Sequence, residues 1–323
     1  MGDNRSLVVR KIDNFVFNTK ILNIIAIVMA VLFVFSFVFF GVKLEQRDQY
    51  YREIYAKMEQ NIYNYNISLI NNGVSPDGAS SQPQEKEIFS SAKEAVCTAF
   101  DGLYKSKSFE ISASGTSTSS AVGQDVEILT GMLINRYEDG SEFQQTIKLE
   151  TKTNFGQSSA QQYVYKNGKC YENDGSNIKN SSGTLSADFK NNFKEVQTQL
   201  KGVPMYLVTK STVVKENYFT VKRTITGKVE CYYASVLLST YSSVKDYAIG
   251  IKEQGGTSLP EFSKIELNCV VDAEGNLVAY SVDEDCKLVK KVVFDITATV
   301  NNKIDYIVLS RNKTPKLTLP NVG

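Results

Sequence analysis

The sequence predicts an α+β protein that consists of an N-terminal transmembrane helix, a stalk helix and a large antiparallel β-sheet with two to three helices packed against it. Three observations support this fold class. Residues 21–42 are apolar and uncharged, and residues 43–70 repeat apolar side chains at helical spacing. From Ser108 onwards, segments alternate apolar and polar side chains with a period of two, which is typical of strands with one buried face.

The apolar run ILNIIAIVMAVLFVFSFVFFGV begins at Ile21 and ends at Val42. A helix of about 22 residues rises roughly 33 Å, which is enough to cross the hydrocarbon core of a bilayer. A cleaved signal peptide has a shorter apolar core of about 7–15 residues and a small-residue cleavage site, and this run shows neither. We therefore expect a permanent single-pass anchor in the cell membrane.

Basic residues flank the anchor equally on both sides, so the positive-inside rule favours neither orientation. Those of the short tail, residues 1–20, are Arg5, Arg10, Lys11 and Lys20, and those after the anchor are Lys43, Arg47, Arg52 and Lys57. Large domains translocate largely regardless of charge. Because the C-terminal domain looks like domains found outside cells, we expect a cytoplasmic tail and an extracytoplasmic C-terminal domain.

The segment 43–70 predicts a stalk helix that leaves the membrane. Its apolar positions, spaced by three and four, are Tyr51, Ile54 or Tyr55, Met58, Ile62 and Tyr65. A dimerising coiled coil is the alternative, but the segment holds fewer than about four heptads. Residues 71–84 (NNGVSPDGASSQPQ) are rich in Gly, Ser, Pro and Asn and predict a flexible linker. The folded domain is therefore expected over residues 85–323.

The first half of this domain begins with an amphipathic helix over 85–106 and continues as strands. Strands are expected from Ser108, over 126–137 and over 143–153, with Asp139-Gly140 as a hairpin turn. A further hairpin is expected over 161–173, where Asn167-Gly168 matches a type I′ turn. Apolar spacings of four, three and four predict a second helix over 186–200.

The second half returns to strands over 206–234, with a turn at Thr226-Gly227. Residues 235–254 are ambiguous: apolar spacings of four and three predict a helix, whereas YYASVLLS alone reads as a strand. We expect the helix. The remaining strands are predicted over 265–271, 278–288, 294–300 and 304–310, with a turn at 273–276.

Composition excludes several classes of function. The chain has no histidine, so Ser-His and Cys-His nucleophile pairs and His zinc sites are excluded. The net charge is +1 and the charges are interspersed, so nucleic-acid binding is not expected. Its five cysteines show no metal-binding spacing; buried thiols are the plainer interpretation, and one disulfide is the alternative. We expect no enzyme activity, no cofactor and no metal, and we assign no catalytic or ligand-binding residue.

An acidic triplet, Asp283, Glu284 and Asp285, is the sequence feature that most resembles a cation site. A strand places Asp283 and Asp285 on one face and Glu284 on the other. Because the three carboxylates are divided in this way, we interpret the triplet as part of a solvated face.

The order of elements resembles a known group of proteins. One helix precedes an antiparallel run with the hairpin YVYKNGKCY; a second helix, more strands, the hairpin VVDAEGNLVAYSV and a final LTLP follow. This is similar to the LolA-like and LppX-like half-barrel domains of bacterial envelope lipoproteins, over roughly residues 85–320. The resemblance implies a curved sheet with helices on its concave face and an apolar cavity for acyl chains. The chain departs from that group because a transmembrane helix replaces the lipidated cysteine.

These observations lead to a main functional hypothesis and an alternative. The main one is a membrane-anchored extracytoplasmic binding domain that holds a hydrophobic ligand, a lipid or acyl group, or a partner protein in a concave sheet. The alternative is a structural or sensory single-pass envelope protein without a small ligand. In both hypotheses the chain would contact the membrane, and its further partner would be the hydrophobic ligand or another envelope protein.

Overall fold

A computed structural model describes residues 46–68, 71, 82–140, 142–166, 168–173, 193–196, 206–253, 256–291, 295–313 and 315–319. The predicted transmembrane helix 21–42 and most of the predicted linker 71–84 lie outside these residues. None of the helices in the described part combines the length and the apolar character that a membrane crossing needs. The chain divides into two compact units, Met1–Ala56 and Lys57–Gly323. In the first unit, residues 46–56 are helical, in agreement with the predicted stalk.

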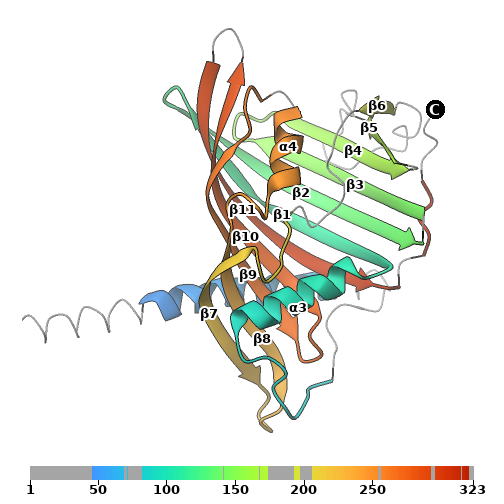
Figure 1. Cartoon of the computed structure of the whole chain (residues 1–323), viewed down its shortest axis with the longest axis vertical. Helices are drawn as coiled ribbons and strands as arrows, with labels where there is room; N and C mark the ends of the chain where they lie inside the picture. The colour runs from blue at the N-terminus through green and yellow to red at the C-terminus, as the bar shows by residue number, and fades with distance from the viewer. Residues whose placement is uncertain are drawn as a thin grey trace, which may run out of the picture. The chain divides into compact units, whose positions relative to one another are not determined.

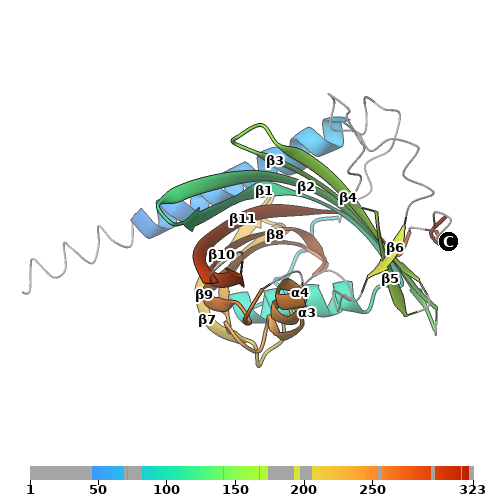
Figure 2. The ribbon, with the colours of Figure 1, turned by 90° about the horizontal axis from the view of Figure 1, so that it is seen from above.

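The second unit is built on one antiparallel sheet of eleven strands, in the order β6-β5-β4-β3-β2-β1-β11-β10-β9-β8-β7 (Figure 1). The first strands are β1 (Ser108–Ala121), β2 (Gln124–Asp139), β3 (Glu142–Thr153), β4 (Ser158–Lys166), β5 (Lys169–Asn173) and β6 (Lys194–Val196). The others are β7 (Val213–Arg223), β8 (Val229–Leu238), β9 (Glu261–Asp272), β10 (Leu277–Lys291) and β11 (Asp295–Arg311). The sheet curves without closing, which confirms the predicted fold class of an α+β protein with a curved antiparallel sheet (Figure 2).

Two labelled helices lie on the concave side of this sheet (Figure 2). Helix α3 (Ala92–Tyr104) begins after Ser91, whose side chain accepts a hydrogen bond from the Glu94 backbone N–H, as helix N-caps commonly do. Helix α4 (Lys245–Glu253) follows β8. The predicted helix 85–106 is therefore confirmed in its main part, and the prediction of two to three helices on the concave face agrees with the described residues.

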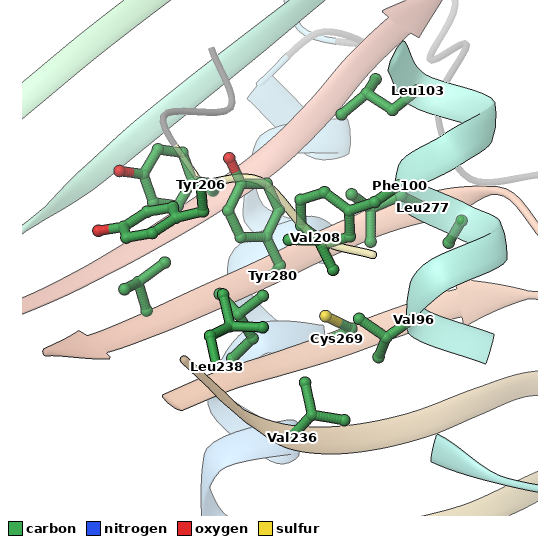
Figure 3. Close-up of a cluster of buried hydrophobic side chains, with 14 of the residues drawn as sticks. Val96, Phe100, Leu103, Tyr206, Val208, Val236, Leu238, Cys269, Leu277 and Tyr280 are labelled. Carbon is green, nitrogen blue, oxygen red and sulfur yellow. The ribbon is translucent and has the colours of Figure 1, made fainter. Parts of the chain in front are cut away.

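The core lies between α3 and the sheet, where Figure 3 shows aromatic and aliphatic side chains from both sides. Small residues at one face of α3, which are Ala92, Ala95 and Ala99, are fully buried and let the helix approach closely. Phe100 on the same helix contacts Tyr280 of β10 edge-on, with ring centroids 5.2 Å apart. Such a contact stabilises the interface beyond the apolar area that it buries.

Three sequence predictions are corrected by the structure. The predicted helix 235–254 is wrong before Lys245, because β8 extends to Leu238 and turns Ala234, Val236 and Leu238 into the core. The predicted helix 186–200 is wrong at Lys194–Val196, which forms β6, and its remainder lies outside the described residues except for Phe193. The two predicted strands 294–300 and 304–310 form one strand, β11, which pairs with β1 from Ser120↔Thr299 to Phe109↔Arg311.

Residues 57–68 of the second unit are helical and contact the face of the sheet opposite α3. Lys57 Nζ lies 3.1 Å from Asp305 Oδ2, and Asn61 donates a hydrogen bond to the same carboxylate. Glu59 accepts hydrogen bonds from Lys222 Nζ and from the Tyr233 hydroxyl. This end of the predicted stalk is therefore attached to strands β7, β8 and β11.

Candidate functional site

The concave face is the surface of the second unit on which side chains from many strands converge. Residues that lie directly opposite each other in an antiparallel sheet point to the same face and form rows across it. One row runs Tyr280–Tyr306–Ala113–Met132–Leu149 from β10 to β3. A second row, four residues further along β10, runs Glu284–Asn302–Ser117–Ile128.

The first of these rows is aromatic under the helices. Tyr280 and Tyr306 stack with their ring centroids 4.4 Å apart and their planes at 3°. Both side chains are almost fully buried, and neither hydroxyl group has a hydrogen-bond partner in the part of the chain that the structure describes. Tyr206 lies close to Tyr280 in Figure 3 and connects to the second row through its hydroxyl group.

Glu284 is the centre of a buried polar cluster in the second row. Its side chain is only 1% exposed, and its carboxylate accepts three hydrogen bonds. The donors are the Tyr206 hydroxyl at 2.6 Å, the Tyr247 hydroxyl of α4 at 3.2 Å and Asn302 Nδ2 of β11 at 2.5 Å. The Ser117 hydroxyl of β1 in turn donates to Asn302 Oδ1. The cluster thus ties α4 and the Tyr206 segment to the floor of the sheet.

The environment raises the pKa of the Glu284 carboxyl above its ordinary value. Burial is the largest cause, because it penalises the charged form, and the hydrogen bonds from Tyr206, Asn302 and Tyr247 offset it only in part. Among the described residues, no lysine or arginine pairs with this carboxyl. The arrangement holds the Glu284 carboxyl in place through these three hydrogen bonds.

Beyond the helices, the concave face is apolar and only half-buried. The half-buried apolar residues that face this side and adjoin the core are Met132, Phe143, Tyr163, Leu288, Val300 and Ile304. They come from β2, β3, β4, β10 and β11, so they span most of the width of the sheet. An apolar surface of this kind, with a few polar groups placed along it, is the usual lining of a site for a hydrophobic ligand.

The structure tests the interpretation of the acidic triplet. Asp283 and Asp285 do share the face opposite Glu284, where Lys264 Nζ lies 3.0 Å from Asp283 and Asn301 donates to Asp285. The interpretation as a solvated face is wrong for Glu284, which is buried. Its apolar neighbours two residues away, Val282 and Cys286, were the sequence signal for this burial, whereas Tyr206, Tyr247 and Asn302 gave none.

Cysteines and acidic residues form no metal site or disulfide in the part of the chain that the structure describes. No group of three or more His, Cys, Asp or Glu residues there could hold a metal ion. All five cysteines are free, and four of them are buried. The interpretation of buried thiols therefore agrees with the structure.

The fold and this face define a class of protein: a curved, unclosed antiparallel sheet with helices on its concave side and an apolar surface beyond them. No family model matches the chain, and no curated protein matches it. A DUF1329 family protein from Desulfovibrio piger is 11% identical in sequence, with 70% of this chain and 93% of that chain covered and a TM-score of 0.20. The MucA/MucB complex of Pseudomonas aeruginosa gives 9% identity, 65% and 93% coverage and a TM-score of 0.10.

These likenesses are weak and concern the fold alone. Neither description names the LolA-like or LppX-like carriers, so that resemblance stays a prediction.

Proposed function

We propose that the chain is a membrane-anchored extracytoplasmic binding protein that holds an acyl chain against the concave face of its sheet. The observation that carries this proposal is the half-buried apolar surface beyond α3, which includes Met132, Leu288 and Ile304. A solvent-facing sheet surface normally carries polar side chains, so apolar residues on several adjacent strands favour a hydrophobic occupant. The apolar run Ile21–Val42 supports the membrane anchor, and it would keep the binding face near a source of lipid.

Photolabelling tests this proposal on the full chain in membranes. A fatty acid with a photoactivatable group on its tail is added, and mass spectrometry maps the labelled residues. We expect labels on the concave residues of β2, β3, β10 and β11. Met132→Asp should abolish them, because the carboxylate would be placed in the path of the acyl chain.

Leu129→Asp is the matched control for this experiment. Leu129 lies on the same strand as Met132 but on the opposite face, and it is 52% exposed. We expect Leu129→Asp to label like the unaltered chain. Labelling that is unchanged in Met132→Asp, or that is confined to the predicted anchor, would contradict the proposal.

A sensory role is the second candidate, and one observation favours it. On β11, Asp305 contacts the helix 57–68, whereas the next residue, Tyr306, lies on the concave face. A ligand on the concave face would therefore act on the same strand that holds the stalk. Deletion of residues 1–18 separates the two roles, because a sensor would lose its output with acyl labelling intact.

A further inference from the structure

In one row of the concave face, an arginine side chain lies beside polar groups that lack hydrogen-bond partners among the described residues. This row runs Phe109–Arg136–Gln145–Tyr165 across β1, β2, β3 and β4. Arg136 and Gln145 lie directly opposite each other, so their side chains are neighbours on the same face. The row lies at the end of β2 that is farthest from the Glu284 row.

Gln145 is fully buried, and neither its amide oxygen nor its amide nitrogen has a hydrogen-bond partner among the described residues. In the same part of the chain, the Nε atom of Arg136 is also buried without a partner. Roughly 90% or more of buried polar groups in proteins are hydrogen-bonded, so each exception calls for an explanation. Three unpaired polar atoms on two facing side chains are explained at once by a ligand that pairs with them.

Arg136 is held in a defined position by aromatic rings. Its guanidinium carbon lies 5.5 Å from the centre of the Phe109 ring and 5.2 Å from that of Phe143. One edge of the guanidinium group, at Nη2, pairs with Glu138, whose side chain is 43% exposed. The Nε atom has no hydrogen-bond partner among the described residues. A guanidinium N–H and a neighbouring amide N–H can each donate one hydrogen bond to a carboxylate or a phosphate.

The rows next to Arg136 and Gln145 are apolar. Ile134 and Ile147 come first, and Met132 and Leu149 follow. Because each row is two residues further along the strand, the successive rows are about 7 Å apart. An acyl chain whose head group lies at Arg136 would therefore extend along the apolar surface described above.

We propose that Arg136 and Gln145 bind the anionic head group, a carboxylate or a phosphate, of the acyl-chain ligand. The tail lies over the half-buried Met132 and Leu149. This inference rests on the proposed function and names the ligand class for it: an anionic amphiphile. Glu138 competes with the head group for Arg136, so its charge weakens binding.

Equilibrium binding of three probes to the full chain in nanodiscs tests the inference: oleate, oleyl phosphate and uncharged oleyl alcohol. Arg136→Gln should weaken oleate or oleyl phosphate binding by about tenfold or more, because a charge-assisted hydrogen bond is lost. The same variant should leave oleyl alcohol binding unchanged. The anion that binds more tightly to the unaltered chain identifies the head group.

Arg136→Gln could also lose binding because it destabilises the fold. Two further variants therefore test the head-group site independently. Glu138→Gln should tighten anion binding, because it removes the competing carboxylate. Arg223→Gln is the matched control, since Arg223 lies on strand β7 of the same sheet and also pairs with a glutamate, Glu87. It should bind all three probes like the unaltered chain.

The outcomes separate this inference from the proposed function. If oleate and oleyl alcohol bind equally well, and neither Arg136→Gln nor Glu138→Gln changes the binding of either, the head-group site is refuted and the apolar binding face stands. If none of the three probes binds, the proposed function fails and the head-group site fails with it.

Discussion

At the scale of single residues, Glu284 is a buried side chain whose ionisation affects the stability of the fold. Burial raises the pKa of its carboxyl from the ordinary value of 4.5, so the neutral form is more favoured in the folded chain than in the unfolded chain. This contribution to stability is fully present below the ordinary pKa, and it is lost as the pH rises through the folded-state pKa. The titratable groups around Glu284 are Tyr206, Tyr247, Tyr306, Asp285 and Cys286.

Glu284→Gln removes this dependence on pH. We expect the free energy of unfolding of the unaltered chain to fall relative to that of Glu284→Gln as the pH rises above 4.5, the ordinary pKa of a glutamate. Urea unfolding at a series of pH values between about 4 and 8 measures the difference. Glu85→Gln, at an 81% exposed side chain, is the control and should run parallel to the unaltered chain. Identical pH slopes for Glu284→Gln and the unaltered chain would refute the assignment.

Gly115 lies at a point where β1 and β11 approach each other closely. A Cβ atom at this position would lie 2.1 Å from the Lys303 carbonyl oxygen and 2.6 Å from Ile304 Cα. Both atoms belong to the backbone, so the strands must separate to admit it. Gly115→Ala should therefore lower the free energy of unfolding by about 1–3 kcal/mol or more.

Gly131→Ala is the control for Gly115→Ala. It lies on the neighbouring strand β2, and its added Cβ would meet no atom within 4 Å. Urea unfolding should place it close to the unaltered chain. Equal losses in the two variants would show that glycine is not needed for strand approach at Gly115.

The sequence predicts well on which face of a strand a side chain lies. It predicts poorly which distant residues pack against that face. The alternation from Tyr280 to Leu288 correctly placed Glu284 opposite Asp283 and Asp285. Its hydrogen-bond donors Tyr206 and Tyr247 are 78 and 37 residues away in the chain. Only the folded chain brings these groups together, so no local pattern could have revealed the cluster.

At the scale of elements, α3 depends on small residues where it contacts the sheet. Ala99 is fully buried, whereas its neighbour Thr98 is exposed. Ala99→Leu should lower the free energy of unfolding by about 1–3 kcal/mol, because the added atoms force the helix away from the strands. Thr98→Leu should change it by no more than about 0.5 kcal/mol, as exposed substitutions usually do.

Thermal unfolding followed by circular dichroism gives both values. If Ala99→Leu were as stable as Thr98→Leu, the close approach of α3 to the sheet would be wrong.

The elements that the sequence predicted correctly are those in which the apolar residues follow one period, either that of a helix or that of a strand. The helix before Ser108 and the hairpins at Gly140 and Gly275, with φ of +62° and +88°, are examples. Residues 235–254 failed because a strand and a helix follow each other there, and their combined apolar spacings imitate one longer helix. The strand β8 is set by its pairing with β7 and β9, which no window of sequence contains.

At the scale of the whole second unit, polar contacts attach the helix 57–68 to the sheet beside the buried Met58. Burial alone would raise the pKa of Glu59, but the hydrogen bonds from Lys222 and Tyr233 and the charge of Lys222 outweigh it and lower this pKa. The stability that this carboxylate contributes is therefore present at neutral pH and is lost as the pH falls. Asp305 supplies the second attachment, to Lys57 and Asn61.

Asp305→Asn tests this attachment. Because Lys57 is 70% exposed, the ion pair contributes only about 0–1 kcal/mol, and we expect a local effect without unfolding of the sheet. Hydrogen exchange followed by mass spectrometry should show faster exchange in residues 57–68 and unchanged exchange in β8–β10. Asp295→Asn, at the exposed start of the same strand, is the control and should leave both regions unchanged. Faster exchange throughout the sheet would contradict a local attachment.

The strand order has a consequence for how the chain is made. Strands β1–β6 form one run of sequential neighbours and β7–β11 form another, and the two runs meet only where β1 pairs with β11. The residues joined there, such as Ser120 and Thr299, are 179 positions apart in the chain. At a synthesis rate of about 5–20 residues per second, β1 waits roughly 10–40 s for its partner. During this time its unpaired edge is open to other chains, so newly made protein is most prone to aggregate, and most in need of a chaperone, before its last strand emerges.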